Sequence, residues 1–281
     1  MVPREIDNDL LRRAGNPTAA LERLIFQAIY GDAGKRDEYL LAAFFDFAHP
    51  TERLWNDLTP RERRLLFNVI RTNQRRLRHL LHIIAPQPNE FIVDVGCGVG
   101  GLAFHLARAG ARVFGLDPNR ESLANGQRLI ARLGVRVPLS VGVCQSLPLG
   151  TASTDKIVCA NVFEHLPEKE AALREFWRVL KPGGRAFIYT DNLTHVLLRI
   201  WARRFGAVLT RSRGRWQVGY SGEAGGHVAL ITPAAMRELL LSLNFNARIV
   251  YSMPVWPVAG RLASRFFCAV AHKPPDRERS P

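Results

Sequence analysis

The chain has 281 residues, of which 47% are hydrophobic, and its formal net charge is +14. This length and composition allow one α/β domain with a full core and an appended segment. The sequence has no long uncharged apolar window and begins with polar, partly acidic residues. We therefore expect no membrane span and no secretory signal. The expected location is the cytoplasm. The 4 cysteines lie far apart without a CxxC pair. This spacing predicts buried thiols and does not indicate a disulfide framework or a zinc site.

The positive charge increases along the chain. The net charge is +2 in residues 1–90, +4 in residues 91–190 and +8 in residues 191–281. Charge of this sign favours polyanionic partners, either nucleic acid or an anionic membrane surface. An arginine-rich composition with a solvated face is the alternative interpretation.

Residues 1–86 are predicted to form a helical extension. Two apolar, periodic segments precede residue 50, and the clearest helix follows them. Thr59 can cap this helix, Pro60 suits its first turn and Glu62 can close a capping box. The helix extends to about residue 84, with its leucines and isoleucines in one stripe and most of its arginines outside that stripe.

Short strands alternate with helices from Phe91 onward, which is typical of a parallel sheet. The fold class is therefore α/β, a doubly wound Rossmann-like sheet. Ligands of such sheets bind beyond the carboxyl ends of the strands, at the switch point. We predict strands near 91–95, 112–116, 136–142, 156–160 and 186–190, and helices near 101–109, 119–133 and 168–179.

The glycine-rich stretch DVGCGVGG lies at that switch point, directly after the first strand. Gly96, Gly98 and Gly100 permit a tight turn and a close approach of the backbone to a ligand. Gly96, Gly98 and Gly101 also satisfy the dinucleotide pattern GxGxxG. Asp117, which lies 19 residues after Gly98, suits a ribose contact in either case. A nicotinamide-dependent oxidoreductase is thus one alternative.

The acid Asp94, two residues before the first glycine, distinguishes between these ligands. A carboxylate at this position would repel a pyrophosphate. It would instead gain a charge-assisted contact of about 1.5 to 3 kcal/mol with the α-ammonium group of S-adenosylmethionine. The sign of the charge therefore favours S-adenosylmethionine as the ligand.

Residues 144–191 extend the pattern with a Leu-Pro turn and the segment RVLKPGG, which we interpret as a structural turn leading into the fifth strand. Together with the glycine loop and Asp117, these motifs occur in the order typical of class I S-adenosylmethionine-dependent methyltransferases of the small-molecule type. The sequence resembles that family over residues 91–191. The resemblance implies a seven-stranded, mostly parallel sheet with an antiparallel last strand. We accordingly divide the chain into a helical extension, 1–86, and a cofactor-binding domain, 87–281.

The resemblance also implies which residues hold S-adenosylmethionine. Asp94 and the glycine-loop backbone would hold the methionine end, Asp117 would accept from both ribose hydroxyls, and Asn161 would border the sulfonium. Val143 stands where the family often has an Asp that accepts from adenine, so we expect the backbone of the next two residues to take over. This departure leaves a non-catalytic, cofactor-binding partner subunit as a second alternative. The full predicted set is Asp94, Gly96, Cys97, Gly98, Gly100, Asp117, Pro118, Val143, Cys144, Gln145 and Asn161, with no metal.

The candidates for a catalytic base are Glu164, His165 and His227, with His195 as a further rival. Glu164 and His165 follow the fourth strand and resemble the EH pair of quinone-pathway O-methyltransferases. In those enzymes the pair and an upstream acid can hold a divalent ion, but Asn161 replaces the acid here. A histidine that caps or packs the following helix is the alternative role for His165.

Residues 193–216 are predicted to form a basic amphipathic insertion after the fifth strand. One interpretation is an interfacial helix in which residues 195–216 contact an anionic membrane surface. The other is a lid packed on the domain with its arginines in water. A nucleic-acid substrate is disfavoured because the sequence has no interleaved stacking platform. We therefore expect a methyltransferase that O-methylates a hydroxylated, lipidic or aromatic small molecule.

Overall fold

The computed structural model describes residues 32–46, 52–166, 168–194, 230–252 and 264–275. The described residues fall into two compact units, which divide in sequence between Ile83 and Ile84. The helices within these ranges include none with the length and apolar character of a membrane span. His195, His227 and nearly all of the predicted insertion lie outside the described residues.

The first unit is helical where it is described. Helix α3 (Ala33–Leu40) begins at Asp32, whose carboxylate accepts hydrogen bonds from the backbone amides of Gly34 and Lys35. This cap satisfies two of the amides that a helix leaves unpaired at its N-terminus. The helix continues into a π-helical turn, Leu41–Phe45, and a short helix, α4 (Glu52–Asn56), follows.

Helix α5 (Pro60–Ile84) forms as the sequence predicts. The amide of Thr59 donates to Oε2 of Glu62 at 2.7 Å, and the amide of Glu62 donates to Oγ1 of Thr59 at 3.3 Å. These reciprocal bonds are the predicted capping box. The predicted apolar stripe is buried at Leu66, Ile70, Leu80 and Ile84.

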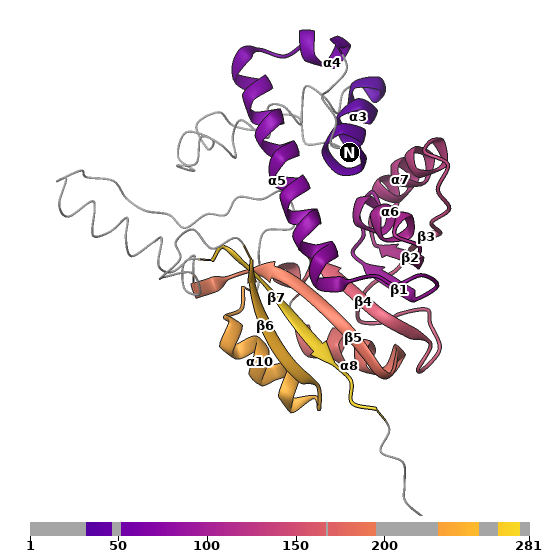
Figure 1. Cartoon of the computed structure of the whole chain (residues 1–281), viewed down its shortest axis with the longest axis vertical. Helices are drawn as coiled ribbons and strands as arrows, with labels where there is room; N and C mark the ends of the chain where they lie inside the picture. Colours follow the sequence, from indigo (N-terminus) through magenta and orange to yellow (C-terminus); the bar gives the residue numbers. More distant parts are fainter. Residues whose placement is uncertain (1–31, 47–51, 167, 195–229, 253–263, 276–281) are drawn as a thin grey trace, which may run out of the picture. The chain divides into compact units, whose positions relative to one another are not determined.

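The second unit is built on a seven-stranded sheet. Its elements are β1 (Phe91–Val95), α6 (Gly101–Arg108), β2 (Arg112–Asp117), α7 (Arg120–Arg132), β3 (Leu139–Val141), β4 (Thr154–Ala160), α8 (Lys169–Val179), β5 (Leu180–Asp191), α10 (Pro233–Ser242), β6 (Asn246–Ser252) and β7 (Phe266–His272). The strand order is β3-β2-β1-β4-β5-β7-β6 (Figure 1). Strands β1 to β5 pair in parallel, whereas β7 is antiparallel to both β5 and β6. The predicted fold class is confirmed.

The two faces of the sheet have different partners, because side chains alternate along a strand. Val93 and Val95 of β1 belong to the core that includes Phe176 of α8 and Met236 of α10. Asp94 lies between them and points to the opposite face, where its carboxyl accepts a hydrogen bond from a backbone amide of α6. Figure 1 shows α8 and α10 apart from α6 and α7.

Two predicted boundaries are wrong. Strand β3 contains residues 139–141 and not 136–142, and β5 begins before the KPGG segment and not after it. KPGG is a bulge within β5: Thr154 pairs with Leu180, whereas Lys156 pairs with Arg185. A turn was expected because Gly and Pro disfavour regular strands. Pairing of this bulge with Lys273 after β7 keeps it in the sheet.

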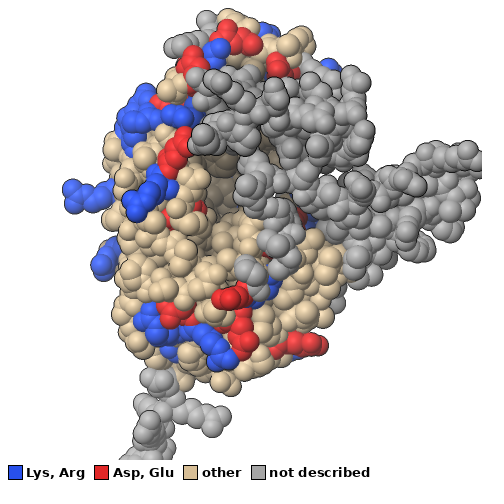
Figure 2. Space-filling view, turned by 180° about the vertical axis from the view of Figure 1, so that it is seen from behind, with Lys and Arg blue, Asp and Glu red and all other residues tan. Residues whose placement is uncertain are grey.

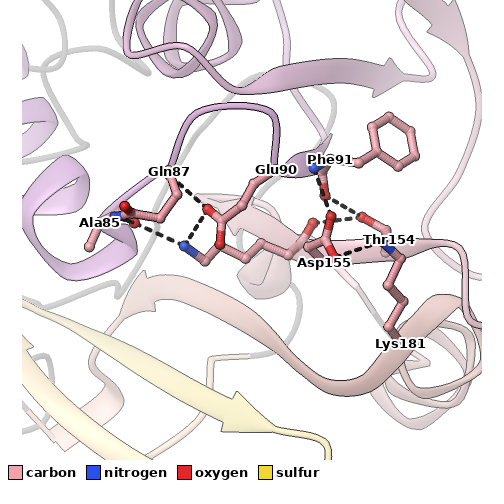
Figure 3. Close-up of polar contacts among 8 residues, drawn as sticks. Ala85, Gln87, Glu90, Phe91, Thr154, Asp155 and Lys181 are labelled. Atoms are coloured by element: carbon pink, nitrogen blue, oxygen red, sulfur yellow. Dashed lines mark hydrogen bonds and ion pairs between the residues drawn. The ribbon is translucent and has the colours of Figure 1, made fainter.

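A polar network fixes the amino edge of the sheet (Figure 3). The buried ammonium of Lys156 donates to Oε2 of Glu90 at 2.6 Å and to the carbonyl of Ala85, directly after α5, at 2.9 Å. Asp155 accepts from the Phe91 amide at 2.9 Å and forms an ion pair with Lys181 at 2.7 Å. These contacts hold the starts of β1, β4 and β5 together. The glycine loop and the segments that follow β2, β3 and β4 lie at the opposite, carboxyl edge of the sheet.

Candidate cofactor and active site

The glycine loop leaves the carboxyl end of β1 and enters α6. Gly96, Gly98 and Gly100 all have positive φ angles, of 72°, 55° and 76°. The amides of Gly96 and Cys97 both donate to the carbonyl of Leu116, at 2.6 and 3.0 Å, so the loop is bound to the end of β2. Positive φ strongly favours glycine, which explains the spacing of the three glycines.

The surroundings of the three glycines differ. A methyl group on Gly96 would lie 2.1 Å from a Cγ atom of Val162, and one on Gly100 would lie 3.0 Å from Cδ1 of Ile130. At Gly98 no described atom lies within 4 Å of the added carbon. The absence of a side chain at Gly96 and Gly100 therefore allows neighbouring side chains of the protein to pack against the loop. At Gly98 it leaves the backbone open to a ligand.

Asp94 is a buried carboxyl next to this loop, with 2% of its surface exposed. One oxygen accepts a hydrogen bond from the Ala103 amide, while Oδ2 has no hydrogen-bond partner among the described residues. Burial raises the pKa of Asp94 to about 7, and the charge of Asp117 adds to this effect. A buried carboxyl with an unsatisfied oxygen is a position that a cationic ligand would stabilise.

Asp117, at the carboxyl end of β2, shapes the loop. Its Oδ2 accepts from the amide of Gly98 at 2.8 Å, and its Oδ1 accepts from the amide of Asn119 at 2.8 Å. Each carboxylate oxygen can accept a further hydrogen bond. Asp117 therefore both supports the loop at Gly98 and keeps acceptors for another ligand, while Pro118 beside it is exposed.

The segment after β3 is the third part of this edge. Val143 is 48% exposed and forms an isolated bridge with Ser146. The Cys144 side chain is buried in the core, its thiol donates to Oε1 of Gln145 at 3.1 Å, and burial raises its pKa to about 11. The thiol is thus occupied, and the Cys144 backbone is what the segment can offer to an adenine ring.

Asn161 directly follows β4 at the same edge. It has a φ of 56°, and its amide donates to the carbonyl of Tyr189 at 2.8 Å. The structure therefore places all of the predicted cofactor residues at the carboxyl ends of four adjacent parallel strands, where doubly wound sheets bind ligands. Val162, which packs on Gly96, was missed by the sequence analysis. Its position directly after β4 is the signal that could have indicated it.

The predicted pair Glu164 and His165 lies in a 3₁₀ turn, Phe163–His165, directly after that edge. The two side chains have different environments: His165 is exposed, whereas Glu164 is 2% exposed and accepts from the Thr190 hydroxyl at 2.8 Å. Burial raises the pKa of Glu164, and the charge of Asp191 adds to this effect. Thr190 and Asp191 were not predicted, although polar residues at the carboxyl end of β5 are the expected signal.

Within the described ranges, no group of three or more His, Cys, Asp or Glu residues could hold a metal ion. His227 and His195, the other candidate bases, lie outside these ranges.

Comparisons with known proteins agree with this geometry. Residues 93–188 match the family Methyltransf_11, described as "Methyltransferase domain". The ubiquinone/menaquinone biosynthesis C-methyltransferase UbiE of Rubrivivax gelatinosus is 31% identical over 200 residues, which are 71% of this chain and 74% of that protein. The chain belongs to the class I S-adenosylmethionine-dependent methyltransferases. This membership argues against the alternative that the chain is a nicotinamide-dependent oxidoreductase.

Two further similarities concern a relative in sequence and a relative in fold. The human mitochondrial ubiquinone biosynthesis O-methyltransferase is 29% identical over 176 residues, 60% of this chain and 45% of that protein. The crystal structure of an S-adenosylmethionine-dependent methyltransferase from Aquifex aeolicus has a TM-score of 0.52 at 17% identity, with 85% of this chain and 96% of that chain covered. The first relative is matched over less than half its length, and the second similarity shows the shared fold.

Proposed function

We propose that this methyltransferase binds S-adenosylmethionine at the carboxyl edge of β1 to β4 and O-methylates a hydroxylated, lipid-soluble small molecule of the quinone or sterol class. The observation that carries the cofactor site is the buried Oδ2 of Asp94, which lacks a partner among the described residues, beside the open backbone at Gly98. When bound, the cofactor supplies an electrophilic methyl group on its sulfonium. The protein then has to orient the acceptor and exclude water.

The chain's own residues divide this task. The ionised Asp94 carboxyl would bind the α-ammonium group, and the loop at Gly98 would lie against the methionine moiety. Asp117 would accept from the ribose hydroxyls with its remaining lone pairs. The adenine ring would lie along Val143 and the backbone of Cys144. The exposed valine offers an apolar contact where an acidic residue is frequent in the family, so we expect adenine to be held by packing as well as by the backbone.

O-methylation requires a base that removes the proton of the acceptor hydroxyl. His165 suits this role because its exposed side chain lies directly after the cofactor edge. Glu164 is turned into the protein and bonded to Thr190, so we propose that it positions the turn of His165 without touching the acceptor. His227 stays a candidate outside the described residues.

The acceptor class is supported by the relatives. The names of the matched proteins refer to ubiquinone, menaquinone and sterols. C-methylation is the second candidate, because the C-methyltransferase UbiE is matched over 74% of its length. Incubation with a hydroxylated quinone precursor and cofactor carrying a ¹³C-labelled methyl group distinguishes the two reactions, since the label becomes bonded to oxygen in one product and to carbon in the other.

The cofactor proposal is tested by calorimetric titration of S-adenosylhomocysteine and, separately, of NAD. We expect binding of the first, no binding of the second and a loss of at least tenfold in affinity for Asp94→Ala. Affinity for S-adenosylhomocysteine that is unchanged in Asp94→Ala would refute the assigned role. Loss of turnover in His165→Ala, with cofactor affinity retained, would support the proposed base; unchanged turnover would exclude it.

We further propose that the protein is cytoplasmic and contacts anionic membranes peripherally through residues 195–216, which carry several arginines and lie outside the described residues. Substitution of Arg199, Arg203, Arg204 and Arg211 by glutamine should weaken sedimentation with anionic vesicles. Undiminished sedimentation of this variant would contradict the role of the segment.

A further inference from the structure

One face of α5 carries exposed arginines that form no ion pair among the described residues. The exposed side chains of this helix include Arg64, Phe67, Arg71, Arg75 and Arg78. At 100° per residue these positions fall within a sector of about 100°, opposite the buried stripe at Leu66, Ile70 and Leu80. Arg64 and Arg78 are about 21 Å apart along the helix axis. We call these five residues the arginine face.

The arginine face has no acidic counterpart. Glu62 is the only acid in the helix sequence, and its carboxylate is engaged by Thr59 in the capping box. Among the described residues, Arg64, Arg75 and Arg78 make no ion pair or hydrogen bond, and Arg71 contacts only the Phe67 ring, at 5.7 Å from its centroid. The face is therefore a row of positive charge available to an anionic partner.

Several other arginines of the described chain have partners. Arg63 of the same helix donates to the Trp55 carbonyl at 2.7 Å and lies over the Trp55 ring, and Arg76 donates to Asn73 at 2.9 Å. In the second unit, Arg174 and Arg178 are paired with glutamates of their own helix. Figure 2 likewise shows Lys and Arg beside Asp and Glu over much of the coloured surface of that view. Exposed arginines without an ion pair among the described residues also occur singly, for example Arg136 and Arg237, whereas α5 carries several of them along one helix face.

An apolar hollow accompanies this charge. A pocket of about 710 Å³ is lined by Trp55, Pro60, Arg63, Arg64, Phe67 and Asn68. Phe67, which lines this hollow, is 46% exposed. An aromatic side chain among arginines at a surface is the combination found where proteins lie against the headgroup region of a bilayer.

We propose that the arginine face docks on an anionic phospholipid surface, with guanidinium groups on lipid phosphates and Phe67 in the headgroup region. Single-stranded nucleic acid is the less favoured partner, because bound bases stack on open aromatic faces. Here one face of the Phe67 ring is covered by Arg71, and one face of the Trp55 ring is covered by Arg63. The inference goes beyond the proposed function, since it requires no methyl transfer and does not involve residues 195–216.

The test uses the full-length protein and vesicles that contain either phosphatidylglycerol and phosphatidylcholine or phosphatidylcholine alone. The triple variant Arg64→Gln, Arg75→Gln, Arg78→Gln removes three charges from the arginine face. The matched control removes three exposed arginines elsewhere: Arg136→Gln, Arg237→Gln, Arg248→Gln. Both variants lower the formal net charge equally, so a difference between them reports position and not total charge.

A basic residue close to an anionic membrane contributes roughly fivefold in binding. We therefore expect the α5 variant to lose more than tenfold, and up to roughly a hundredfold, in partition onto the anionic vesicles. The control should lose less than threefold. Phe67→Ser should lose binding that persists in 0.5 M salt, where the arginine contribution is screened. Circular dichroism and binding of S-adenosylhomocysteine should be unchanged in all variants.

The proposal would be overturned by equal losses in the two triple variants, by equal binding of the wild type to both vesicle types, or by an α5 variant that loses single-stranded RNA binding while keeping vesicle binding. The last result would assign the face to nucleic acid. Loss of vesicle binding only in the variant of residues 199–211 would overturn the docking of α5 and support the separate proposal for that segment. None of these results depends on methyl transfer, so failure of the proposed function is distinguishable.

Discussion

The buried carboxyl of Asp94 predicts that cofactor affinity depends on pH. Burial raises its pKa to about 7, so the ligand-free enzyme is a mixture of protonated and ionised forms at neutral pH. A bound α-ammonium group stabilises only the ionised form. Binding therefore releases a proton below pH 7, and affinity falls as the pH falls. With this pKa, about half of the enzyme is ionised at pH 7 and about 3% at pH 5.5, so the Kd should rise roughly 16-fold over that interval.

Replacement of Asp94 by asparagine separates binding from stability. Asp94→Asn should weaken S-adenosylhomocysteine binding at pH 7 roughly ten- to a hundredfold, because a charge-assisted contact is lost, and should abolish the pH dependence. Stability should change in the opposite direction. A folded-state pKa of about 7 against an ordinary value of 3.8 means that the wild type loses stability as the pH rises between these values. Above pH 7 the ligand-free variant should therefore be more stable, by on the order of a few kcal/mol.

Isothermal titration calorimetry between pH 5.5 and 7, in two buffers of different ionisation enthalpy, measures both the affinity and the released proton. Asp155→Asn is the matched control, because that carboxyl lies at the amino edge of the sheet in an ion pair with Lys181. It should keep the wild-type pH profile of binding. A wild-type affinity that is flat over this range, or an asparagine variant at position 94 that binds like the wild type, would refute the reasoning.

Three other predictions concern the loop and the scaffold. Gly98→Ala should lose at least tenfold in S-adenosylhomocysteine affinity, with only about 1 to 2 kcal/mol of backbone strain. Gly96→Ala should lower the melting temperature more, because its methyl group meets a valine. The reverse order of the two melting temperatures would contradict the inference that Gly98 is open and Gly96 is packed. Glu90→Gln leaves the buried Lys156 ammonium without its carboxylate and should reduce the free energy of unfolding in urea by about 3 kcal/mol, with ligand affinity unchanged. Thr59→Ala should cost about 1 kcal/mol by the same measurement through loss of the capping box; an unchanged midpoint would show that the cap contributes nothing.

The sheet could be predicted because its pattern is local. Each central strand is a short apolar run bounded by glycine or polar residues, and these runs match β1, β2, β4 and part of β5. The start of β5 could not be found in this way. Leu180 belongs to the sheet only because Thr154 and Lys273 pair with the segment around it. Pairing of this kind depends on residues far away in the chain, which periodicity does not report.

The candidate site shows the same limit at finer scale. The glycine spacing predicts a tight loop, but it treats Gly96 and Gly98 as equivalent. Their difference arises from Val162, more than 60 residues later in the sequence, which fills the space at Gly96 and leaves Gly98 open. Likewise, the charge of Asp94 indicates a cationic ligand, but its raised pKa depends on burial under α6 and on the neighbouring charge of Asp117.

The adjacent residues Glu164 and His165 have different environments, and this difference depends on residues outside their own motif. Neighbours in a 3₁₀ turn point in different directions, so one of the pair can be buried while the other is exposed. The buried carboxyl is held by the hydroxyl of Thr190, at the carboxyl end of β5. The position of the turn that carries His165 therefore depends on β5 as well as on β4. It follows that the proposed base is positioned by a strand that the EH motif itself does not contain.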